Sequence, residues 1–483
     1  MPTSSDLAQA ASFCRRRLTG AFVAGAPGGR EVDPGHPGRA VVGGLALAVL
    51  LGAGAAIAHV LAPRPPDDWA SHGLVVSKET GQAYVVLPDE DDPRPADDGH
   101  VELHPVVNLA SARLILGHDV DPILLPQDVI DEQVVAHDVG ILGAPGSLPA
   151  SDRLVESGWT ACTADRRGVR VRVAAEPDVR PAPDTGLVVA VGHDFYLVAS
   201  VQVGDEPPSA YALPLPGGDA VDNMLGALGL PARALAPRVP RAWLDLFPTG
   251  APLGWASFGL THAGERPGRW DLAGVPRGAR VGDVLQDAAG DAVVMTTDGP
   301  ADLDPFAFAV YAWTTVAGRE APRVFSVDRP PDLTRTRLPM AAAHWPAAPP
   351  QPMATDPCAV LVTAPDGPAT VRLAQGPGAG FAAEQVRARR ADVAVDPGRG
   401  ALGRAVRAGG GDPSPVLIDS IGRANPLDGD AAARLGYADA SAPVVPAAWM
   451  GLFGEGVRLS RELALCAPVG VTDGSCDSAA SEG

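Results

Sequence analysis

PRAWLDLFPTGAPL (residues 240–253) recurs further along the chain as PAAWMGLFGEGVRL (residues 446–459). Seven of the fourteen positions are identical, and both tryptophans are among them. Upstream, the triplet LGL (residues 228–230) corresponds to LGY (residues 435–437) at nearly the same spacing. Self-similarity at a fixed spacing indicates internal duplication, so we expect a fold with two related halves.

Strand-turn-strand patterns recur around these segments. In GLVVSKETGQAYVVL, for example, two apolar β-type runs flank a Thr-Gly turn. Glycine (56) and proline (50) are frequent and aperiodic, which predicts short elements joined by many turns in a β-rich α+β fold. Four such cores are predicted, at residues 73–87, 186–199, 281–299 and 416–427.

Two further stretches, residues 159–174 and 356–374, each combine β-type runs with one cysteine. We interpret them as the two halves of a central β domain with four small repeats around it. If a pseudo-two-fold axis relates the halves, Cys162 and Cys358 meet across that axis. A disulfide there would close a long loop and so remove entropy from the unfolded chain.

AVVGGLALAVLLGAGAAIAHVLA (residues 40–62) carries no formal charge over 23 residues, a length that spans a bilayer as a helix. Five arginines precede it, whereas Asp67 and Asp68 follow soon after, so the positive-inside rule places the N-terminus in the cytoplasm. The alternative is a cleaved signal peptide, because AGA and AIA within the stretch resemble cleavage sites.

The segment before the span, SSDLAQAASFCRRRLTGAFVAG (residues 4–25), predicts an amphipathic helix. Its apolar face has little protein to pack against, so it needs the headgroup region or a partner. The face comprises Leu7, Ala11, Cys14, Leu18 and Phe22.

These patterns predict ten segments in the chain. They are a cytoplasmic helix and hinge (1–39), a transmembrane helix (40–62), a Pro-rich spacer (63–72), repeat 1 (73–117), the first half of the central domain (118–185), repeat 2 (186–255), repeat 3 (270–320), the second half (321–400), repeat 4 (401–465), and a C-terminal clasp and tail (466–483).

Charge and cysteine usage restrict the function further. The part of the chain after the span has 54 acidic and 33 basic residues, a net charge of −21, which disfavours nucleic acid and anionic lipid as partners. Four cysteines follow the span, in an oxidising compartment, and no C-x-x-C motif indicates zinc or a redox site. Disulfides among Cys162, Cys358, Cys466 and Cys476 are therefore the expected use, and a pair of Cys466 with Cys476 would close a short clasp.

Motifs for catalysis are weak. The only lysine, Lys78, stands in SKETG rather than in a Walker loop. IDSIG (residues 418–422) lacks the first glycine of a nucleophile elbow, and turn chemistry explains it better. His100, Glu102 and His104 alternate and could share one strand face as metal ligands, but a solvated face is the preferred interpretation. We therefore expect no catalytic residue, no cofactor and no metal.

The repeated aromatic and leucine residues are interpreted as core residues. Each occurs twice because each half needs the same side chain to fill its hydrophobic core. An exposed tryptophan pair that grips a glycan is the less favoured alternative. These structural-repeat residues are Trp243, Leu246, Phe247, Trp449, Leu452 and Phe453.

With these features in view, the chain resembles the EccB membrane component of actinobacterial type VII (ESX) secretion systems. The resemblance covers nearly the whole chain and rests on several motifs in matching order. They are SFCRRRLTGAF, the span, TGQAYVVL, HPVVNLASARLILG, ILGAPGSLP, WLDLFPTGAPL, and LGY followed by WMGLF.

The resemblance implies a single-pass protein whose elongated exterior domain has four repeats around a disulfide-bridged central β domain. It also implies a scaffolding role in the secretion core complex with an EccC-type motor ATPase, EccD, EccE where present, and a mycosin protease, and self-association within that complex. An ATPase activity has been proposed within the family. The alternatives are a membrane-anchored cell-wall binding or sensing module and an extracytoplasmic nucleotide hydrolase.

Overall fold

A computed structural model describes residues 3–24, 44, 47–48, 69–70, 73–87, 101–202, 207–266, 275–314, 322–329, 334–338, 344–353, 356–364, 367–376, 386–387, 391–405 and 412–468. The chain divides into two compact units, Met1–Pro66 and Asp67–Gly483. The predicted span (40–62) and spacer (63–72) lie almost entirely outside the described residues. Within the described ranges, no helix has both the length and the apolar character to cross a membrane.

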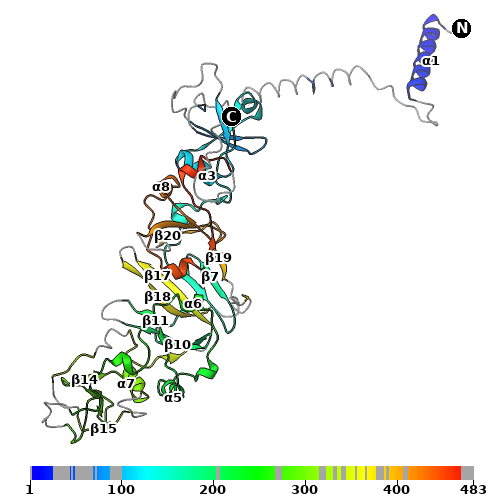
Figure 1. Cartoon of the computed structure of the whole chain (residues 1–483). Coiled ribbons are helices and arrows are strands. Elements are labelled where there is room, and N and C mark those ends of the chain that lie inside the picture. Colours follow the sequence, from blue (N-terminus) through cyan, green and yellow to red (C-terminus); the bar gives the residue numbers. More distant parts are fainter. Residues whose placement is uncertain are drawn as a thin grey trace. The chain divides into compact units, whose positions relative to one another are not determined.

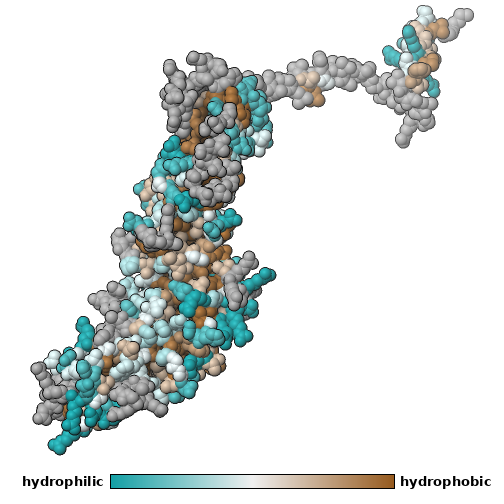
Figure 2. All heavy atoms as spheres, in the orientation of Figure 1, coloured by the Kyte–Doolittle hydropathy of each residue, from teal (hydrophilic) through white to brown (hydrophobic). Residues whose placement is uncertain are grey.

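The first unit contains α1 (Ser4–Ala24), in the stretch that predicts an amphipathic helix. The carboxylate of Asp6 accepts hydrogen bonds from the backbone N–H (3.0 Å) and the hydroxyl (2.6 Å) of Thr3, which closes the first turn. The apolar residues Leu7, Leu18 and Phe22 are exposed. In Figure 2, α1 therefore presents strongly hydrophobic and strongly hydrophilic residues side by side.

The described part of the second unit contains five β-sheets (Figure 1). Sheet 1 has the order β4-β1-β2-β3-β5 and comprises β1 (Gly73–Ser77), β2 (Ala83–Val86), β3 (Glu102–Pro105), β4 (Pro122–Leu125) and β5 (Val134–Val135). Sheet 4 has the order β20-β21-β22-β23 and comprises β20 (Ala401–Ala405), β21 (Ser414–Ile418), β22 (Arg423–Pro426) and β23 (Gly454–Glu455).

These two sheets share one hydrophobic core. Leu74 and Val85 of sheet 1 belong to the same buried cluster as Leu402 and Leu417 of sheet 4. Short helices complete the cluster, and their apolar side chains pack against both sheets. They are α3 (Leu109–Leu116), α8 (Ala431–Arg434) and α10 (Arg461–Ala464), while α4 (Gln127–Asp131) packs on sheet 1 alone.

Sheets 2 and 3 form a second such pair. Sheet 2, with the order β11-β10-β9-β16, comprises β9 (Thr185–Val191), β10 (Asp194–Val201), β11 (Ser209–Pro214) and β16 (Gln351–Pro352). Sheet 3, with the order β14-β13-β12-β15, comprises β12 (Val284–Gln286), β13 (Ala292–Met295), β14 (Pro300–Leu303) and β15 (Val324–Ser326). Their common core contains Leu197 and Leu213 from sheet 2, Val284 from sheet 3, and residues of α5 (Ala220–Ala227) and α7 (Pro305–Ala312).

The fifth, central sheet combines strands from two distant parts of the sequence in the order β19-β7-β6-β17-β18-β8. It comprises β6 (Trp159–Cys162), β7 (Val169–Val173), β8 (Arg180–Pro181), β17 (Pro357–Ala364), β18 (Gly367–Gln375) and β19 (Ala391–Val395). The predicted class, a β-rich α+β fold with several sheets, is confirmed. The four-repeat organisation, its pseudo-two-fold symmetry and the segment boundaries stay predictions.

Candidate functional site

The centre of the second unit is the pair of strands β6 and β17, which come from opposite halves of the sequence. They run antiparallel, with Cys162 opposite Cys358 and Ala161 opposite Ala359. Successive residues of a strand point to opposite faces of the sheet. The cysteines therefore lie on one face and the two alanines on the other.

Cys162 and Cys358 form a disulfide, which confirms the predicted pairing. Both residues are fully buried, and 196 positions separate them in the sequence. Val360 and Ala374 pack around them. A cross-link over so long a loop constrains the unfolded chain strongly.

The other cysteines are not part of this centre. Cys14 is free and exposed in α1. Cys466 is disulfide-bonded. Cys476 lies outside the described residues, so the clasp of Cys466 with Cys476 stays a prediction.

The repeated tryptophan segments pack on the alanine face of the central sheet. Each begins with a short helix after an extended proline, α6 (Arg241–Leu244) and α9 (Ala447–Met450). Proline suits this position because it has no N–H to leave unpaired. All six repeat residues predicted to be core residues are buried in the same cluster as Ala161 and Ala359: Trp243, Leu246, Phe247, Trp449, Leu452 and Phe453.

Beyond the helices, the two segments attach to their sheets by corresponding hydrogen bonds. The N–H of Gly250 donates to the carbonyl of Ala212 at 3.0 Å, and the N–H of Gly456 donates to that of Ala424 at 3.0 Å. The first segment thus bonds to the edge strand β11 of sheet 2, and the second provides β23, the edge strand of sheet 4, while both fill the core of the central sheet. The segments therefore connect the central sheet to sheets 2 and 4.

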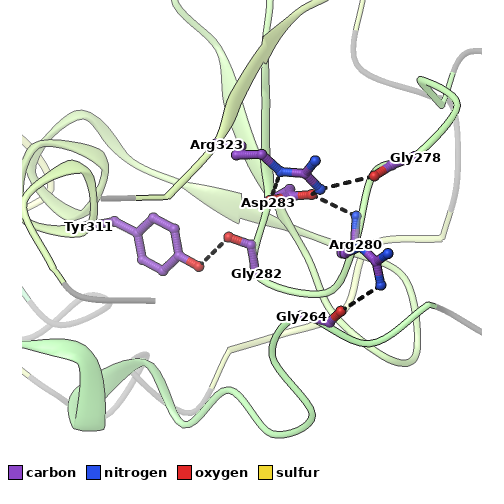
Figure 3. Close-up of polar contacts among 7 residues, drawn as sticks. All are labelled: Gly264, Gly278, Arg280, Gly282, Asp283, Tyr311 and Arg323. Atoms are coloured by element: carbon purple, nitrogen blue, oxygen red, sulfur yellow. Dashed lines mark hydrogen bonds and ion pairs between the residues drawn. The ribbon is translucent and has the colours of Figure 1, made fainter. Parts of the chain in front are cut away.

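A buried ion pair that no sequence motif indicated lies beside sheet 3 (Figure 3). Asp283 is almost fully buried and accepts hydrogen bonds from the backbone N–H of Arg280 (2.7 Å) and from the guanidinium of Arg323. Arg323 also donates to the carbonyl of Gly278 at 2.9 Å. The hydrogen bonds with Asp283 raise the pKa of Arg323, which therefore stays charged.

Tyr311 of α7 extends this anchor. Its hydroxyl donates to the carbonyl of Gly282 at 2.6 Å, next to Asp283 in the chain. Burial raises the pKa of Tyr311, so the phenol remains protonated and keeps this hydrogen bond. A buried charge is tolerated when it is paired and hydrogen-bonded. The network accordingly joins α7, β12 and the chain before β15, and its chemistry is that of a structural anchor.

Two residues in weak catalytic motifs, Ser420 and Lys78, both lie in turns. Ser420 lies in the turn between β21 and β22, where Asp419 Oδ1 accepts the backbone N–H groups of Ile421 (3.0 Å) and Arg423 (2.9 Å). This is turn geometry rather than that of an activated serine. Lys78 is exposed, and its backbone N–H donates to the carbonyl of Leu125 at 2.9 Å.

The three residues weighed as a metal set, His100, Glu102 and His104, are only partly described. Glu102 Oε1 lies 3.7 Å from His104 Nε2, and His104 is largely buried. His100 lies outside the described residues. Within the part of the chain that the structure describes, no group of three or more His, Cys, Asp or Glu side chains could hold a metal ion.

Comparison with known proteins places the chain among secretion components. Residues 2–472 match the family model described as "Type VII secretion system ESX-1, transport TM domain B". ESX-1 secretion system ATPase EccB1 of Mycobacterium tuberculosis is 25% identical over 294 residues, which are 59% of this chain and 56% of that protein. The chain thus matches about half the length of that relative.

A longer match is to ESX-3 secretion system ATPase EccB3 of Mycolicibacterium smegmatis, 27% identical over 84% of this chain and 79% of that protein. Two solved structures share the fold at 22% identity and a TM-score of 0.58 each. One is a chain of an intact ESX-5 inner membrane complex, with 99% of this chain and 98% of that chain covered. The other is an EccB3 dimer from the ESX-3 core complex, with 81% and 99% covered.

Proposed function

The chain belongs to the EccB family of type VII secretion proteins, and on that premise we propose that it is a structural subunit of a type VII secretion core complex. Residues 40–62 anchor it in the cytoplasmic membrane, with α1 in the cytoplasm and the second unit outside. The observation that carries the proposal is the family match over residues 2–472, nearly the whole chain.

The described architecture supports a scaffolding role. A scaffold must keep its shape while other subunits bind to it. The sheets of the second unit are joined by shared hydrophobic cores, while the disulfide holds the central sheet together and the anchor at Asp283 fixes sheet 3 to α7. Interiors packed in this way are resistant to deformation. The second unit accordingly serves as a rigid part of the assembly.

The partners belong to the same proposal. They are an EccC-type motor ATPase, EccD, EccE where present, a mycosin protease, and further copies of this chain. The descriptions of the related structures support assembly, since one is an inner membrane complex and another is a dimer.

The role proposed for the chain is non-enzymatic, although the curated relatives are named ATPases. Lys78, the only lysine, stands in a turn after β1 without a glycine-rich phosphate loop. We expect the purified full-length chain to release no phosphate from ATP above the buffer blank. Turnover that is lost in Lys78→Ala would overturn this part of the proposal.

Co-purification tests the scaffold function. The full-length chain, tagged and extracted in mild detergent from its own organism, should bring down a motor ATPase and at least one other membrane subunit in constant ratio. Recovery of this chain alone under conditions that preserve the other membrane subunits in one complex would contradict the proposal.

Cysteine labelling tests the topology independently. Cys14 is the free cysteine in α1, so a membrane-impermeant maleimide should label it only after the cells are permeabilised. An Asp245→Cys variant is the matched control, since Asp245 is exposed in the second unit and should be labelled in intact cells. Labelling of Cys14 in intact cells would show that the N-terminus lies outside and would contradict the proposed topology.

A further inference from the structure

A surface pocket of about 700 Å³ lies where the central sheet meets sheet 2. Its walls come from the turn between β6 and β7, from β9 and the start of β10, from α5, and from the segment before α6. The side chains that matter for its chemistry are Asp165, Arg166, Phe195, Asp222, Arg233 and Arg238. Three arginines around one pocket are unexpected in a chain with a net charge of −19.

Arg233 is held in place before any ligand arrives. Its Nε and Nη2 donate to the carboxylate of Asp222 at 3.2 and 3.0 Å, and its guanidinium carbon lies 5.7 Å from the centre of the Phe195 ring. The bonds from Arg233 lower the pKa of Asp222, so the pair stays ionised. A guanidinium has five N–H donors, and these two bonds leave three of them for another acceptor.

Arg166 occupies an unusual backbone conformation at the pocket. Its φ is +56°, the left-handed region that most side chains avoid. Two hydrogen bonds hold it there: the N–H of Arg166 donates to the carbonyl of Arg238 at 2.8 Å, and the N–H of Arg238 donates to Asp165 Oδ1 at 2.8 Å. The turn therefore keeps Arg166 and Arg238 on the same pocket rim.

The cationic groups outweigh the anionic ones. Asp222 is matched by Arg233. Asp165 lies 3.9 Å from Arg166 Nε, and both side chains are largely exposed, so this pair is weak in water. Arg238 is exposed and makes no side-chain ion pair among the described residues. The pocket thus has one guanidinium in a fixed position and two more on its rim.

We propose that this pocket binds an oxyanion, a carboxylate or a phosphate, with Arg233 as the fixed contact and Arg166 and Arg238 closing over it. The planar fork of a guanidinium matches the two oxygens of either group, and bonds between ionised partners are stronger than neutral ones. The phenyl ring of Phe195 supports Arg233 and shields one side of the site.

Calorimetric titration of the full-length chain in detergent tests the site, with inorganic phosphate in one arm and glutarate in the other. Saturable binding of either anion supports the proposal, and the anion with the lower Kd identifies the ligand class. Arg238→Gln should weaken binding by about tenfold, the loss expected for one charge-assisted hydrogen bond. No saturable binding in either arm would overturn the proposal.

Two further variants separate binding from folding. Arg166→Gly removes a charge, but glycine accepts a positive φ without strain, so this variant should keep its melting temperature while binding weakens. Arg167→Gln is the matched control, because Arg167 is the exposed neighbour that does not line the pocket. Equal weakening in Arg167→Gln, or unchanged binding in both Arg166→Gly and Arg238→Gln, would show that the anion binds without this pocket.

Discussion

The two tryptophan segments, residues 240–253 and 446–459, bury the same side chains but differ in how their polar atoms are paired. The indole Nε1 of Trp243 donates to the carbonyl of Ala161 at 2.9 Å. The indole Nε1 of Trp449 is buried and has no hydrogen-bond partner within the described part of the chain. The local helix is the same in both copies, so the difference arises from the surface that each tryptophan meets.

Two further positions show the same divergence. Tyr437 corresponds to Leu230; both are buried, but the hydroxyl of Tyr437 donates to the carbonyl of Pro149 at 2.8 Å. Arg241 corresponds to Ala447, and its guanidinium lies 5.5 Å from the ring centre of Tyr196. The two similar segments thus share their buried positions, whereas each has its own polar partners.

The largest effect is expected from removing the disulfide that links β6 to β17 in the central sheet, on which both tryptophan segments pack. The double variant Cys162→Ala/Cys358→Ala should lose about 2–5 kcal/mol of unfolding free energy, because the unfolded chain regains the freedom that the cross-link removes. Urea unfolding of the full-length chain measures this loss, and Cys14→Ala is the control without a disulfide. A double variant as stable as Cys14→Ala would contradict the structural role of the bond.

The indole hydrogen bond gives the next largest effect. Trp243→Phe should cost about 1–3 kcal/mol more than Trp449→Phe, because only the first removes a hydrogen bond and leaves a buried carbonyl with a lost donor. Both substitutions remove the same volume, so the difference isolates the polar contribution. Phe247→Leu and Phe453→Leu serve as a control pair without polar atoms. If Trp243→Phe and Trp449→Phe lost the same free energy of unfolding, the indole hydrogen bond would not distinguish the stability of the two segments.

Tyr437 tests the second difference. Tyr437→Phe should cost about 1 kcal/mol at neutral pH, the worth of one hydrogen bond. Burial raises the pKa of Tyr437 from 10.0 to about 12. A raised acid pKa means that the folded state holds the proton more tightly, so the stabilisation is complete below pH 10 and falls as the pH rises towards 12.

The pH profile of the same variant provides its check. The advantage of wild type over Tyr437→Phe should be constant up to about pH 10 and narrow above it, as measured by urea unfolding at each pH. Because Tyr311 is present in both proteins, its own raised pKa cancels in the comparison. A constant advantage through pH 11 would show that Tyr437 ionises freely in the folded chain.

The smallest effect is expected at Arg241. Arg241→Ala converts this position to the residue of the other copy and removes the contact with Tyr196, a hydrogen bond at 3.3 Å and a 3.9 Å ion pair with Asp245. Arg241 and Asp245 are exposed and Tyr196 is half-buried, so the loss should stay below about 1 kcal/mol. Thermal unfolding would detect it, and Asp245→Ala alone should change even less. A larger loss of unfolding free energy would mean that the surface contacts of Arg241 contribute substantially to the stability of the first segment.

Sequence patterns are enough to predict the class of the fold and the burial of the repeated tryptophan, leucine and phenylalanine residues. Periodicity, turn residues and the duplicated tryptophans are local patterns, and burial follows from them because apolar side chains leave water wherever the chain permits. The pairing of Cys162 with Cys358 follows from the sequence only if the two β-type runs that hold the cysteines belong to halves related by a pseudo-two-fold axis.

The polar partners, in contrast, become visible only in the folded chain. Asp283 meets Arg323 across 40 positions, Trp243 meets Ala161 across 82, and Tyr437 meets Pro149 across 288. The arginine pocket likewise combines four segments that are separate in the sequence. Hydrogen bonds depend on the distance and angle between two atoms, and that geometry is set by strand register and loop path, which no local pattern encodes.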